Sequence, residues 1–140
     1  MSNTRKQPVA FRFAARTLRD LRQRAQDTGL TQTALAERYI EEGMKRDQHP
    51  LIWFRDRPAG RRAGLVGSRL DVGDVIEAIR QNNNSIEEAA DYLNLPIEKV
   101  QACVRYYADY KDEIDAWIQA GQEAADRLDE RLQREQEALA

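Results

Sequence analysis

The chain has 140 residues, of which 41% are hydrophobic and 33% are charged, so it can bury one modest core or two small ones. Its apolar runs are far shorter than the roughly 20 residues that cross a bilayer, and its first ten residues lack the apolar stretch of a signal peptide. These features exclude a membrane-spanning protein and predict a cytoplasmic one. A single cysteine, Cys103, leaves no internal disulfide, as in a reducing compartment.

The net charge of −2 conceals two halves of opposite sign. Residues 1–70 hold 15 Lys or Arg against 7 Asp or Glu, whereas residues 71–140 hold 7 against 17. A basic half suits a polyanion such as nucleic acid, and an acidic half suits a basic protein partner. The alternative is two solvated surfaces with an accidental bias.

Residues 8–14, PVAFRFA, alternate apolar side chains with others and predict a short strand. A helix follows at 15–28, with Leu18, Leu21 and Ala25 on one face, and Gly29 ends it. Thr31 or Thr33 caps a second helix that runs to residue 47. The inner face of that helix is predicted to contain Leu35, Tyr39, Ile40 and Met44.

A lone strand with two short helices has unpaired backbone groups and too little core to fold by itself. We therefore expect a second copy to supply the partner strand. Residues 8–47 resemble the ribbon-helix-helix repressors of the MetJ and Arc superfamily, in which a two-stranded ribbon enters the DNA major groove. The alternative is that residues 8–14 pack on their own helices, with the arginines in solvent.

Successive side chains of a strand point to opposite faces, so alternate residues of 8–14 share one face. Val9, Phe11 and Phe13 point to the core, which turns Pro8, Ala10 and Arg12 toward the groove. Arg12 can bind guanine in bidentate fashion, which is worth roughly 1–3 kcal/mol of discrimination. By the resemblance, the start of the second helix binds phosphate. The predicted DNA contacts are Lys6, Ala10, Arg12, Arg16, Thr31, Gln32 and Thr33, with Arg5 as a further candidate.

Residues 48–71 are rich in Gly, Pro and Arg, and predict a connector with short extended pieces. No lysine and hydroxyl pair follows its glycines, so nucleotide binding is rejected. The only histidine, His49, lacks the companions of a metal site and is interpreted as a solvated linker residue. The arginines of this segment either contact phosphate, neutralise the acidic half, or lie in solvent: Arg55, Arg57, Arg61 and Arg62.

Residues 72–111 predict three helices, the last two forming a tight helix-turn-helix. Ser85 with Glu88 predicts a capping box at the start of the second helix. Asn94 predicts the end of that helix, and Pro96 the start of the third. Ala90, Asn94 and Val100 match the small, left-handed and β-branched positions of such a motif, and Cys103 is an inward apolar filler. The net charge of −4 over residues 71–111 favours a structural or partner-binding role over DNA reading.

Residues 112–140 predict one amphipathic helix with a thin apolar stripe. Beyond Gly121 we expect it to fray unless a groove receives it. The open alternatives are binding to a partner, docking on its own domain, and a short coiled coil in the dimer. The candidate partner-binding residues are Trp117, Ile118, Leu128, Arg131, Leu132 and Arg134.

Residues 49–118, with HPLIWFRDRPAGRRAGLVGSRLDVGDVIEA and SIEEAADYLNLP, resemble the helix-turn-helix-like domain of unknown function in certain VapB-type antitoxins. The resemblance implies a partner, a PIN-domain ribonuclease toxin, and autorepression of a shared operon. By charge alone, Arg127, Arg131 or Arg134 is a candidate to enter the metal-binding carboxylate cluster of such a toxin and displace the metal.

The prediction is therefore a mainly α-helical, dimeric antitoxin that binds operator DNA through residues 1–47 and a toxin through residues 112–140, without catalysis, cofactor or metal. One alternative is a dimeric ribbon-helix-helix repressor with a dimerising or effector-binding C-terminal half. A plain interaction protein without DNA binding is a third.

Overall fold

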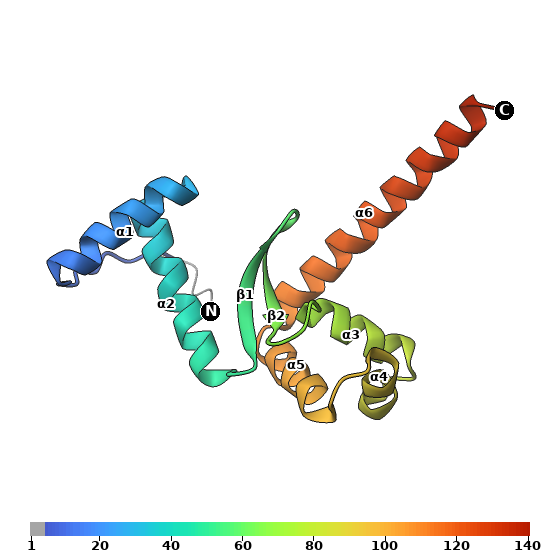
Figure 1. The fold of residues 1–140 in the computed structure, drawn as a ribbon, viewed down its shortest axis with the longest axis horizontal. Coiled ribbons are helices and arrows are strands. Elements are labelled where there is room, and N and C mark those ends of the chain that lie inside the picture. Colours follow the sequence, from blue (N-terminus) through green and yellow to red (C-terminus); the bar gives the residue numbers. More distant parts are fainter. Residues whose placement is uncertain (1–4) are drawn as a thin grey trace. The chain divides into compact units, whose positions relative to one another are not determined.

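The computed structural model describes residues 5–140, and it is mainly helical with one small antiparallel sheet. Figure 1 shows its helices and strands, and the chain divides into two compact units, Met1–Gly43 and Met44–Ala140. In the part that the structure describes, no helix has the length and apolarity to cross a bilayer. The elements are α1 (Ala15–Thr28), α2 (Gln32–Gln48), β1 (Ile52–Arg57), β2 (Gly60–Leu65), α3 (Val72–Gln81), α4 (Ile86–Leu93), α5 (Ile97–Asp109) and α6 (Lys111–Ala138).

The first unit consists of α1, most of α2 and the preceding segment. Gly29 ends α1 in the left-handed conformation, with φ 71°, and its N–H donates to the carbonyls of the last turn. Thr31 caps α2, because its Oγ1 accepts the N–H of Ala34 at 3.1 Å. Both local signals in the sequence are confirmed, and the choice between the two threonines falls on Thr31.

Among residues 5–140, the predicted strand over residues 8–14 pairs with no other strand. Residues 5–14 form neither helix nor strand, and the rings of Phe11 and Phe13 lie 6.1 Å apart. Strand pairing with a second copy therefore stays a prediction.

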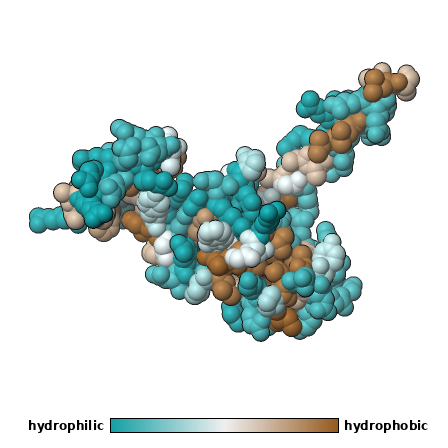
Figure 2. All heavy atoms as spheres, in the orientation of Figure 1, coloured by the Kyte–Doolittle hydropathy of each residue, from teal (hydrophilic) through white to brown (hydrophobic). Residues whose placement is uncertain are grey.

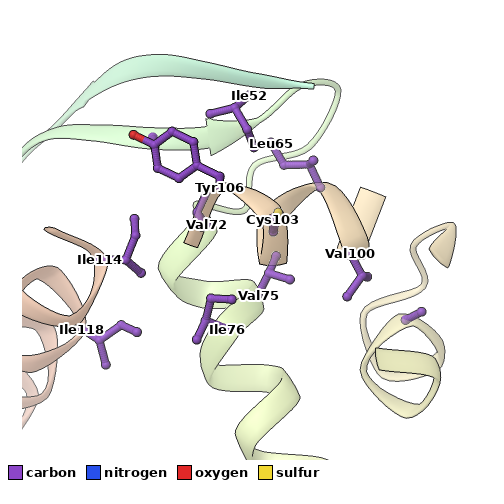
Figure 3. Packing of buried hydrophobic residues seen from close by; sticks show 12 residues of the cluster. Ile52, Leu65, Val72, Val75, Ile76, Val100, Cys103, Tyr106, Ile114 and Ile118 are labelled. Carbon is purple, nitrogen blue, oxygen red and sulfur yellow. The ribbon is translucent and has the colours of Figure 1, made fainter. Parts of the chain in front are cut away.

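A β-hairpin occupies the segment that the sequence predicts to be a connector. β1 and β2 pair from Ile52 with Leu65 to Arg57 with Gly60, and Gly60 has a φ of 128° that suits glycine. Ile52 and Leu65 are almost completely buried and point into the core of the second unit (Figure 3). The connector assignment for residues 48–71 is therefore corrected, because the extended pieces pair and complete a core.

Two arginines of β1 fix the loop that follows β2. Arg55 donates from Nη1 to the carbonyl of Ser68 and from Nη2 to that of Leu70, both at 2.6 Å. Arg57 donates to both carboxylate oxygens of Asp71. Burial lowers the pKa of Arg55, whereas the hydrogen bond to Asp71 raises that of Arg57. These two arginines are thus internal ties that neutralise an acidic residue, one of the alternatives from the sequence.

Helices α3, α4 and α5 have the ends that the sequence predicts within a few residues. Asp71 and Asp74 form a reciprocal capping box at α3, and Ser85 Oγ accepts the N–H of Glu88 at α4. Asn94 takes the left-handed conformation between α4 and α5, with φ 55°. The predicted left-handed turn residue is confirmed.

The core of the second unit combines the hairpin with α3, α5 and the start of α6 (Figure 3). Tyr106 of α5 lies beneath the hairpin and is fully buried. Cys103 is also fully buried, and burial raises the pKa of its thiol to about 12, so it remains a neutral apolar filler as predicted. The cluster comprises Ile52, Ala63, Leu65, Val72, Val75, Ile76, Ala90, Val100, Cys103, Tyr106, Ile114 and Ile118.

His49 belongs to this unit and is 9% exposed, so its interpretation as a solvated linker residue is wrong. Its Nε2 lies 2.8 Å from Oδ2 of Asp109 at the end of α5, and its ring packs edge-on against Tyr106. One helical turn earlier in α2, Lys45 Nζ lies 3.6 Å from the carboxylate of Glu113. The last turn of α2 is therefore attached to the corner between α5 and α6.

Helix α6 has two parts with different surroundings. Ile114 and Ile118 are core residues, and Asp115 binds Lys111, Tyr107 and Arg80, whose hydrogen bonds lower the pKa of Asp115 to about 2. Residues 121–140 are all exposed, yet the helix continues to Ala138 (Figure 1). This continuity differs from the fraying that the sequence predicts beyond Gly121.

A substitution at Gly64 tests whether the hydrogen bonds of Arg55 to the loop carbonyls stabilise the second unit. A Cβ at this position would collide with the guanidinium of Arg55 and displace it from its carbonyl partners. We expect Gly64→Ala to lower the free energy of unfolding by about 2 kcal/mol, measured by urea denaturation.

The matched control is Gly121→Ala, because no atom lies within 4 Å of a Cβ there. Alanine favours a helix interior over glycine, so this variant gains up to about 1 kcal/mol. Equal stability of the two variants would contradict the role of Arg55.

Candidate functional site

The first unit buries few of its apolar side chains. Among residues 5–43 only Ala25 and Leu35 are buried. The side chains predicted for its core are largely exposed, with 62% for Phe11 and 46% for Ile40. The exposed large apolar residues of this unit are Val9, Phe11, Phe13, Leu30, Tyr39 and Ile40.

An open apolar groove lies between α1 and α2. Its walls come from the end of the N-terminal arm, residues 5–14, from Leu21 of α1, and from Tyr39 and Ile40 of α2. Arg24 crosses it and donates from Nε to the Tyr39 hydroxyl at 3.4 Å. The full lining is Phe13, Thr17, Asp20, Leu21, Arg24, Ala36, Tyr39 and Ile40. The predicted inner face of α2 therefore borders a groove that one chain leaves open.

Basic side chains line the arm and α1 of the same unit. Arg12 is exposed, whereas Lys6 and Arg16 lie near carboxylates of their own chain. Lys6 Nζ lies 2.6 Å from Glu37, and Arg16 Nε lies 4.0 Å from Asp20. All seven predicted DNA contacts are exposed, namely Lys6, Ala10, Arg12, Arg16, Thr31, Gln32 and Thr33.

The start of α2 has a cationic neighbour that the sequence reasoning missed. Arg22 lines a shallow hollow together with Gly29, Thr31 and Gln32, whereas Arg16 does not line it. An anion at the start of a helix meets free N–H groups and a favourable dipole, and a guanidinium strengthens that field. The pattern that could have identified Arg22 is its position two turns before Gly29, on the side of α1 that turns toward the next helix.

The exposed part of α6 has three distinct sides. Helical spacing places Gly121, Ala125, Leu128 and Leu132 in one apolar seam, which continues from Ile114 in the core. Figure 2 shows hydrophobic atoms along the otherwise hydrophilic C-terminal half of α6. Arg131 borders this seam, and Arg127 and Arg134 lie farther round the helix on the same side. Glu123, Glu130 and Glu137 lie on the back, where Arg134 lines a hollow together with Glu130 and Glu137.

The six predicted partner-binding residues separate into two groups. Ile118 is 6% exposed and belongs to the core, so its assignment to a partner is corrected. Trp117 is partly buried, and the guanidinium of Arg62 lies 4.8 Å from its ring centroid. Leu128, Arg131, Leu132 and Arg134 are exposed on the free part of α6.

Comparisons of this chain with protein-family models, with curated proteins and with solved structures found no match. Within residues 5–140, no three His, Cys, Asp or Glu side chains lie together as a metal site requires.

The apolar groove generates a prediction about association. Burying an isoleucine in an interface contributes roughly 1.5–3 kcal/mol, and a buried charge reverses that gain. We expect Ile40→Glu to weaken self-association of the full chain at least tenfold, measured by sedimentation equilibrium. The control is Tyr92→Glu on α4, which is 69% exposed and lies in the second unit. An equal effect of both substitutions, or none from Ile40→Glu, would contradict association through this groove.

Proposed function

We propose that this protein is a dimeric antitoxin, which binds operator DNA through its first unit and sequesters a PIN-domain ribonuclease toxin through the free part of α6. The toxin identity rests on the resemblance of residues 49–118 to VapB-type antitoxins. The ribbon-helix-helix and helix-turn-helix arrangements belong to the same proposal.

The observation that carries the proposal is the open apolar surface of the first unit. Phe11, Phe13 and Ile40 are exposed in a unit that buries only two small or medium side chains among its described residues. A groove lined by apolar side chains and flanked by exposed aromatic residues is typical of an interaction site. A second copy covers them symmetrically, since an antiparallel ribbon of two arms places their apolar faces over the four helices.

The polar side of such a ribbon is basic. Arg12 lies on the face opposite Phe11 and Phe13 when the arm is extended, and Arg22 lies beside the start of α2. A symmetric dimer would present two copies of Arg12 and two of Arg22. Phosphate contacts by paired cations and helix starts supply affinity, and the guanidinium of Arg12 supplies base discrimination.

The free part of α6 suits a foreign groove better than its own copy. Glu135 falls on the apolar seam between Leu132 and Leu139, so a parallel coiled coil would bring two such carboxylates together. In an antiparallel pair centred between Leu128 and Leu132, the two copies of Arg131 would face each other, and their like charges would repel. A partner with an apolar groove would bury Leu128 and Leu132, and carboxylates along one rim of that groove would pair with Arg131. The metal-binding carboxylates of a PIN enzyme are such a rim.

DNA binding is tested by Arg12→Ala. A bidentate contact to guanine is worth about 1–3 kcal/mol, so we expect operator affinity to fall roughly tenfold to a hundredfold in a gel shift with the promoter region of the operon. The charge-matched control is Arg46→Ala, at an exposed position near the end of α2, and it keeps most of the affinity. Unchanged binding by Arg12→Ala would reject the ribbon.

Toxin binding is tested with the product of the adjacent open reading frame. We expect a small, carboxylate-rich ribonuclease that the full chain inhibits, and the double substitution Leu128→Asp and Leu132→Asp to abolish co-purification. The control Glu130→Gln alters the back of α6 and keeps the complex. A neighbouring gene of another kind, with DNA binding intact, would favour a dimeric repressor without a toxin.

A further inference from the structure

An ion pair between Lys6 and Glu37 joins the N-terminal arm to α2. Lys6 Nζ lies 2.6 Å from Oε1 of Glu37. The hydrogen bond and the charge of Glu37 raise the pKa of Lys6, so the ammonium remains charged. Both side chains stay accessible, with 79% of Lys6 and 44% of Glu37 exposed. The contact is therefore formed, charged, and open to competition from solution.

The surface that receives Lys6 is an acidic turn in a basic unit. Residues 5–36 hold seven Lys or Arg against two Asp or Glu, and the next turn of α2 introduces Glu37, Glu41 and Glu42. Glu42 lies 3.7 Å from Arg38, whereas Glu41 adds to the field at Lys6. Lys6 of the arm thus forms an ion pair with Glu37, and the charge of Glu41 adds to the negative potential around it.

We propose that Glu37 is an internal competitor of DNA phosphate for Lys6, and that this ion pair latches the arm of the free protein. The inference rests on the proposed function, in which Lys6 contacts DNA. Glu37 occupies one of the three N–H donors of the ammonium and offsets its charge, so DNA gains less from Lys6 while this ion pair is formed. The latch lowers affinity for any duplex and leaves base discrimination by Arg12 unchanged.

The exposure of the pair sets the size of the effect. An exposed ion pair is weak and is screened by salt, so its removal alters binding only modestly. We expect roughly a two- to fivefold change at low salt, which shrinks as salt is added. A latch of this strength lets the arm open readily while it disfavours weak, non-specific contacts.

The test measures binding of the full chain to a short duplex of mixed sequence by fluorescence anisotropy at low salt. Glu37→Gln keeps the shape of the side chain and removes the latch, so it binds roughly two- to fivefold more tightly than the unmodified chain. Glu41→Gln removes the same charge one turn along α2 and gains less. In the Lys6→Ala background, Glu37→Gln gains nothing, because the cation for which it competes is absent.

An equal gain from Glu37→Gln and Glu41→Gln, or a gain that persists without Lys6, would overturn the latch in favour of a general charge effect. Unchanged affinity of Glu37→Gln, with the duplex still bound and Lys6→Ala weakened, overturns the latch alone. Absence of any duplex binding by the unmodified chain overturns both the latch and the proposed DNA function. A DNA-free readout accompanies these measurements: the pKa of Lys6, followed by NMR, falls in Glu37→Gln when the ion pair exists in solution.

Discussion

Among its described residues 5–43, the first unit buries only Ala25 and Leu35, and its proposed role follows from that small core. Two short helices offer one apolar stripe each, and those stripes bury Ala25 and Leu35 but leave Tyr39 and Ile40 open. The arm adds Phe11 and Phe13 to the open surface. In the second unit, by contrast, a hairpin covers the helices and completes the core around Tyr106. One unit is therefore self-sufficient, and the other is proposed to depend on a partner copy.

The arginines of residues 1–70 also fall into two sets, one in each unit. Arg55 and Arg57 bind Asp71 or loop carbonyls, Arg61 lies 3.2 Å from Asp56, and Arg62 stacks on Trp117. These cations serve the second unit and have carboxylate, carbonyl or ring partners within it. The positive charge available for a polyanion therefore comes mainly from the arm and α1, and Glu37 holds part of it.

Features that depend on neighbouring residues were predictable, and features that depend on distant ones were not. Gly29, Thr31 and Asn94 determine backbone conformation locally, so the sequence identified the helix ends that they form. The burial of His49 depends on Asp109, which is 60 residues away, and the hairpin depends on a core supplied by α3 and α5. The position of Arg22 beside Thr31 likewise depends on how α1 and α2 pack. The sequence therefore predicted the ends of the helices better than the contacts between distant residues.

Helix α6 illustrates why the predicted fraying of residues 121–138 differs from the structure. Starting a helix is the costly step, because several residues must be ordered before the first hydrogen bond forms, whereas each later residue adds a bond of its own. Ile114 and Ile118 anchor the first two turns in the core, so the exposed part of α6 only has to extend a helix that already exists. A partner that binds Leu128 and Leu132 then meets a largely ordered seam, and less conformational entropy is lost on association. The core of the second unit thereby supports the proposed binding of a partner by α6, through residues that contribute nothing to that core.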